Sequence, residues 1–175
     1  MEHITLPNLF FQKALENADK PFLWAKKNKE WESLSWQETE VKVKQVAAGL
    51  KYHGIMPGDK VIIVSENRPE WIISDLAINT LNAITVPAYI TNTEDDHRYI
   101  IEHSDAKAVI VSDNILANRI ALALSKVNLC KLLITIDEYN GFMPEGIKVE
   151  SFEKLTQSGE ENISTALHNL NTIDR

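Results

Sequence analysis

The sequence contains few glycines, and their spacing matches no phosphate-binding motif. None of them completes the G-x-G-x-x-G pattern of a dinucleotide-binding turn or the G-x-x-x-x-G-K-[ST] pattern of a Walker loop. The six are Gly49, Gly54, Gly58, Gly141, Gly146 and Gly159. We therefore do not expect this chain alone to cradle a dinucleotide or a triphosphate.

Cysteine and an excess of basic residues are also missing. Cys130 is the only cysteine, which excludes an intramolecular disulfide and is consistent with a reducing compartment. The 18 Lys and Arg residues are outnumbered by 25 Asp and Glu residues, which gives a net charge of -7. Because nucleic-acid-binding proteins usually carry a basic stripe, this balance argues against nucleic acid as a partner.

No long apolar run is present. The apolar stretches are interrupted every few residues, well short of the roughly 20 residues that a membrane-spanning helix needs. The first residues, Met1, Glu2 and His3, do not begin the basic-then-apolar pattern of a secretory signal. We expect a cytoplasmic protein without a transmembrane segment, with peripheral membrane association as the alternative.

The stretch that organises the chain runs over residues 57–71. A Pro-Gly-Asp turn is followed by four β-branched residues at 61–64 and then by SENRPEW at 65–71. This order predicts a buried parallel strand that feeds its crossover helix. Asn67 is the expected cap of that helix, with Pro69 and Glu70 in its first turn.

The residues before this stretch predict a lead-in of different character. Apolar residues at 9–15 indicate an amphipathic helix, and residues 22–34 an antiparallel hairpin in which Trp24 and Trp31 can form a cross-strand pair. Ser35 and Glu38 have the spacing of a capping box. They predict a helix that begins after Ser35 and ends near Gly54.

Apolar runs and helical patterns then alternate along the chain. The runs lie at residues 61–64, 84–86, 108–111 and 132–136, and the helical patterns at 71–81, 93–103 and 114–127. The alternation predicts an α/β fold, with a mostly parallel, doubly wound sheet flanked by helices and a small antiparallel hairpin near the N-terminus. After Asp137 the pattern becomes turn-rich. A short helix capped by Ser151 and ending at Gly159 is expected there, followed by another over 163–170.

Ligands of such sheets bind beyond the carboxyl ends of the strands, which selects residues 65–67, 88–92 and 112–113. Other candidates have simpler structural explanations. The three acids at 94–96 resemble a metal site but equally suit the first turn of a helix. His97 and His103 are too far apart to form an i, i+4 zinc pair. Cys130 is expected to be buried, and Trp71 and Tyr99, which could stack on a purine, are expected in the core.

Several stretches together carry a family resemblance. They read LSWQE at 34–38, AAGL at 47–50, GIMPGDKV at 54–61, SENRPEW at 65–71, ITVPAY at 84–89 and YIIEHSDAK at 99–107. In this order they resemble the amino-terminal part of an adenylate-forming acyl-CoA synthetase, most of all the long-chain fatty-acid–CoA ligase branch. The resemblance covers roughly residues 5–160.

The resemblance implies a reaction in which ATP and a fatty acid form an acyl-adenylate, and coenzyme A then displaces AMP, with Mg2+ assisting. The family's phosphate loop, adenine-binding motifs and carboxyl-terminal lid are expected beyond Arg175, so the chain alone is expected to lack activity. Residues 1–175 are then one domain, a fragment of the larger AMP-binding domain. Within it, residues 8–56 form the lead-in, 57–137 the βα repeats and 138–175 a connecting tail.

The resemblance also implies a cofactor site. In related short-chain members the loop after the second strand and the helix after the third shape the coenzyme A nucleotide pocket, which corresponds here to Tyr89, Ile90, Thr91 and Arg119. Arg119 can pair with a phosphate. The alternative is that these are ordinary loop and helix-surface residues.

Two other functions remain open on the sequence. A receiver-type signalling module is suggested by the acid that follows the strand at 61–64, although the first sixty residues do not fit it. A dimerisation module is also compatible, because the long-chain ligases associate as homodimers through this end of the chain.

Overall fold

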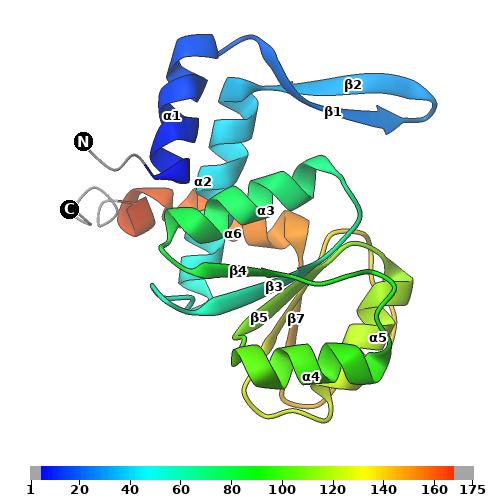
Figure 1. The fold of residues 1–175 in the computed structure, drawn as a ribbon. Helices are drawn as coiled ribbons and strands as arrows, with labels where there is room; N and C mark the ends of the chain where they lie inside the picture. The colour runs from blue at the N-terminus through cyan, green and yellow to red at the C-terminus, as the bar shows by residue number, and fades with distance from the viewer. Residues whose placement is uncertain (1–4, 168–175) are drawn as a thin grey trace.

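The computed structural model describes residues 5–167 and has the expected α/β architecture (Figure 1). A five-stranded sheet contains β3 (Lys60–Val64), β4 (Ile84–Pro87), β5 (Ala108–Val111), β6 (Leu132–Thr135) and β7 (Lys148–Ser151). The strand order is β4-β3-β5-β6-β7, and every neighbouring pair is parallel. The chain therefore runs outward from β3 first to one side and then to the other, which is the flavodoxin-like doubly wound order.

Helices cover both faces of this sheet. In Figure 1, α3 (Pro69–Thr80), α2 (Trp36–Tyr52) and α6 (Phe152–Leu167) lie on one face, while α4 (Glu94–Ser104) and α5 (Asn114–Leu124) lie on the other. Successive residues of β3 alternate between the two cores: Ile63 packs into the first and Ile62 into the second. Helices on both faces confirm the doubly wound prediction. Burial on both sides explains why the central strands are continuously apolar.

The lead-in consists of α1 (Leu6–Asn17) and a hairpin of β1 (Pro21–Lys27) and β2 (Glu30–Ser35) that projects from the body in Figure 1. The expected Trp24–Trp31 pair is wrong, because Trp24 lies opposite Ser33 and Trp31 opposite Lys26. The two-residue turn sets this register. Both of its residues have positive φ, which pairs the strands directly on either side of the turn.

Two helix starts show which local signals decide a boundary. At α2 the capping box is confirmed: Ser35 Oγ accepts from the Glu38 N–H at 3.1 Å, and Glu38 Oε2 accepts from the Ser35 N–H at 2.7 Å. At α3 the expected Asn67 cap is wrong, since the cap residue is Arg68, whose side chain makes no capping hydrogen bond. Proline disfavours helical geometry in the residue before it, so Arg68 stays extended and the helix begins at Pro69.

The end of the described chain differs most from expectation. Instead of a short helix that ends at Gly159, α6 continues through Gly159. A Cβ atom added there would lie 1.8 Å from the Gln45 carbonyl oxygen and 2.9 Å from the Gly49 nitrogen. The glycine thus allows two helix backbones to touch rather than ending a helix. The part of the predicted last helix beyond residue 167 lies outside the described residues.

Candidate functional site

The loops at the carboxyl edge of the sheet are held by polar contacts of their own. Arg68, after β3, donates from Nη1 to Asp137 at 3.0 Å and from Nε to Glu70 at 2.8 Å. Asp113, after β5, accepts from the Leu116 N–H at 2.8 Å and caps α5. These charged groups therefore fasten the loops beside the point where the strand order reverses, which is where ligands of such sheets bind.

Arg119 lies next to the loop between β4 and α4, where the other predicted cofactor residues sit. Its Nη1 donates to the carbonyl oxygens of Ile90 at 3.0 Å and Asn92 at 2.7 Å. The structure thus brings together a helix residue and a loop that are well separated in sequence. Tyr89 stands apart, with 79% of its surface exposed.

A shallow hollow of about 450 Å³, here called the Arg119 hollow, opens beside this contact. It is lined by Thr91, Asn92, Thr93, Glu94, Arg119 and Leu122. Two of the four predicted cofactor residues, Thr91 and Arg119, therefore line one cavity. Within residues 5–167, Nη1 is the only guanidinium nitrogen of Arg119 that forms a hydrogen bond, so Nε and Nη2 can donate to an anion.

His97 is buried close enough to Arg119 to feel its charge, whereas sequence reasoning weighed it only as half of a zinc pair. It is 1% exposed, and its Nε2 has no hydrogen-bond partner within the described part of the chain. Burial lowers the pKa of His97, and the charge of Arg119 lowers it further, against a smaller opposing effect of Asp96. The i, i+4 relation to Ile101 is the sequence signal that places His97 on the buried face of α4.

A pH dependence of stability follows from this neutral histidine. The unfolded chain binds a proton near the ordinary pKa of 6.5, whereas the folded protein resists it. Below that pH the unfolded state carries more protons, so stability should fall as the pH drops. We compare the free energy of unfolding in urea at about pH 7 and pH 5. Between these two pH values His97→Leu should lose less of it than the wild type does.

His53 offers the comparison, because burial lowers its pKa as well. It accounts for the pH slope that remains in His97→Leu. An unchanged slope in His97→Leu would show that the buried imidazole is not the sensor.

The remaining candidates have structural roles. Asp96 bonds to Thr93, Asp95 pairs with Arg98 and Glu94 with Lys126, and no cluster of metal-ligating residues occurs within residues 5–167. Cys130 is buried as predicted, and burial raises the pKa of its thiol to about 11. The core prediction is wrong for Tyr99, which is 62% exposed and stacks on His103, because the buried face of α4 carries His97 and Ile101 instead.

Comparison with known proteins identifies the family. The model of the AMP-binding enzyme family matches residues 10–165. A long-chain-fatty-acid–CoA ligase 6 of Rattus norvegicus is 30% identical over 89% of this chain, and the ligase FadD15 of Mycobacterium tuberculosis is 25% identical over 90%. The chain spans 22% and 25% of the length of these two relatives.

Solved structures show the same fold. The adenylation domain of a carboxylate reductase from Mycobacterium chelonae superposes with a TM-score of 0.78 at 17% identity, over 93% of this chain and 30% of that one. A benzoate CoA ligase from Burkholderia xenovorans gives 0.70 at 22% identity, over 86% and 28%.

The family match also covers most of the lead-in before β3, which a receiver-type module leaves unexplained. None of the helices described is both long and apolar enough to cross a membrane. On the extent of the sequence match and the shared fold, the chain belongs to the family of AMP-binding enzymes.

Proposed function

We propose that this chain is the amino-terminal part of a long-chain fatty-acid–CoA ligase. The whole protein would join a fatty acid to coenzyme A at the expense of ATP, releasing AMP and pyrophosphate through an acyl-adenylate. The observation that carries the proposal is the family match over residues 10–165, together with relatives that are named long-chain ligases.

The Arg119 hollow is our candidate for part of the coenzyme A nucleotide site. Arg119 is anchored through Nη1 to two loop carbonyls, so its remaining N–H groups are held in place before a ligand arrives. Such a preorganised guanidinium suits a phosphate oxygen, because it can donate two parallel hydrogen bonds. Thr91 adds a hydroxyl on the loop side of the same hollow.

ATP and Mg2+ are expected to be held mainly by residues outside the described range. Residues 5–167 contain neither a glycine-rich phosphate loop nor a cluster of acidic ligands for a cation. We accordingly expect this chain alone to catalyse no adenylation. A cytoplasmic location remains a prediction from the sequence, with peripheral membrane association as the alternative, and a homodimer remains a prediction from the resemblance.

The test is a pyrophosphate-release assay with palmitate, ATP, Mg2+ and coenzyme A. We expect turnover from the product of the full reading frame and none from residues 1–175. In the active protein, Arg119→Ala should raise the KM for coenzyme A by about tenfold, the effect of losing a charge-assisted hydrogen bond, with little change in the KM for ATP.

Lys154→Ala is the matched control, since it removes an exposed positive charge from α6 and should leave both KM values unchanged. Adenylation by residues 1–175 alone would contradict the proposed division of the activity. Normal KM values in the Arg119→Ala enzyme would show that Arg119 does not bind coenzyme A.

A further inference from the structure

The amino edge of the sheet, opposite the Arg119 hollow, carries a row of lysines. Lys60 begins β3, Lys107 and Lys131 immediately precede β5 and β6, and Lys148 begins β7. Main-chain hydrogen bonds join them across the sheet: Lys107 N–H to Lys60 carbonyl at 2.9 Å, Lys131 to Lys107 at 3.3 Å, and Lys148 to Lys131 at 2.9 Å. Parallel strands all start at one edge, so residues far apart in the sequence meet there.

Three of these lysines surround a cavity of about 280 Å³, here called the lysine hollow. Its lining residues are His53, Gly54, Ile55, Asp59, Lys107, Leu129, Lys131, Leu132 and Lys148. Among the residues that the structure describes, the only carboxylate in the lining is Asp59, and its Oδ2 already accepts the Met56 N–H at 2.8 Å. The hollow is therefore a basic site on a chain whose net charge is -7.

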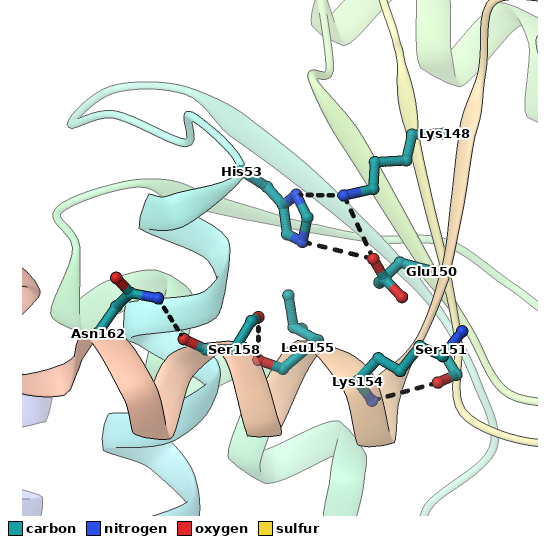
Figure 2. A network of polar contacts seen from close by, with 8 residues as sticks. All are labelled: His53, Lys148, Glu150, Ser151, Lys154, Leu155, Ser158 and Asn162. Carbon is teal, nitrogen blue, oxygen red and sulfur yellow. Dashed lines mark hydrogen bonds and ion pairs between the residues drawn. The ribbon is translucent and has the colours of Figure 1, made fainter.

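The charge of Lys148 is balanced locally. Figure 2 shows its Nζ between Nδ1 of His53, at 3.3 Å, and Oε2 of Glu150, also at 3.3 Å. To accept from Lys148, His53 Nδ1 must be unprotonated, and burial together with Lys148 lowers the pKa of this imidazole. The side chain of His53 is 7% exposed, so His53 and Lys148 form a rigid edge of the hollow at the end of α2.

Lys107 and Lys131 have no such balance. Neither forms an ion pair with any residue between 5 and 167. They occupy neighbouring register positions, one residue before the paired Ala108 and Leu132. Like charges on adjacent strands repel one another, so an anion bound between Lys107 and Lys131 would relieve that repulsion.

We propose that the lysine hollow binds a small polyvalent phosphate anion. Ammonium groups donate hydrogen bonds to phosphate oxygens as point charges. Among the described lining residues the only aromatic ring is the imidazole of His53, whose side chain is 7% exposed and offers little surface to a nucleotide base. The volume suits a phosphate or pyrophosphate group. The site lies at the opposite edge from the proposed coenzyme A site and does not depend on it.

The proposal is tested by titrating residues 1–175 with inorganic pyrophosphate. Binding is measured by calorimetry and by the change in melting temperature. Pyrophosphate should raise the melting temperature of the wild type by mass action. The double variant Lys107→Gln and Lys131→Gln should bind at least about tenfold more weakly, because it loses two charge-assisted contacts. Without ligand the double variant should melt no lower than the wild type, since the repulsion between Lys107 and Lys131 has been removed.

The control variant, Lys42→Gln with Lys154→Gln, removes the same charge from exposed helix positions and should bind as the wild type does. Equal loss in both double variants would overturn the proposal by showing non-specific attraction, and so would unaltered binding in the Lys107 and Lys131 variant.

A second arm separates a soluble phosphate from a lipid headgroup. Sedimentation with phosphatidylcholine vesicles, with and without phosphatidic acid, is compared for the same three proteins. Binding to the acidic vesicles that is lost only in the Lys107 and Lys131 variant supports the site with a lipid phosphate as ligand. Binding to pyrophosphate alone supports it with a soluble ligand, and binding to neither overturns it.

Discussion

Replacing Gly159 with alanine should lower the free energy of unfolding by about 3 kcal/mol, at the upper end of the range for overpacking. The added methyl group would lie 1.8 Å from the Gln45 carbonyl oxygen, and a backbone atom cannot move aside as a flexible side chain can. In an open helix the same change would stabilise the protein by roughly 0.5–1 kcal/mol. The sign of the effect, read from a urea denaturation midpoint, therefore reports the contact between α2 and α6.

The neighbouring exposed Glu160 provides the control. Glu160→Ala changes the same turn of α6 without approaching α2. It should change the free energy of unfolding by no more than about 0.5 kcal/mol. A Gly159→Ala protein as stable as the wild type would mean that the two helices do not touch in solution.

Truncating either Ile62 or Ile63 to alanine should cost about 2–5 kcal/mol of stability, the usual range for a buried isoleucine. The two residues are adjacent in β3 but belong to different cores, Ile63 beneath α2 and α3 and Ile62 beneath α4 and α5. A sheet covered on one face would be sensitive at only one of the two positions. Chemical denaturation of both variants measures the burial of each face separately.

Ile84→Ala serves as the internal standard, since Ile84 lies in the edge strand β4 and is 48% exposed. Its loss should stay below about 1 kcal/mol. Similar losses at all three positions would indicate a general weakness of the sheet rather than two separate cores.

The secondary structure was predictable wherever the local signal was redundant. The four β-branched residues of β3 and the capping box of α2 each specify one conformation, and those boundaries agree with the structure to about one residue. The Asn67 cap failed because two local rules competed and the constraint from Pro69 was stronger. The hairpin register failed because it depends on which two residues take positive φ.

Long-range features could not be predicted in this way. Nothing near Gly159 in the sequence indicates that Gln45 will press against it, so the glycine resembled a helix end. The contact of Arg119 with Ile90 required knowing that α5 lies beside the β4–α4 loop, and a family resemblance supplied that placement. The lysine hollow depends on the register of three strands and was not foreseen at all.

The packing of α6 on α2 also dictates the order in which this chain can finish folding. During synthesis α2 leaves the ribosome well before its partner α6, because Phe152 lies far beyond Tyr52 in the chain. Until then the face of α2 around Gly49 has no partner, and a long loop must close before the contact forms. Such distant pairing gives the domain a high contact order, so its last step should be slow relative to the formation of its helices.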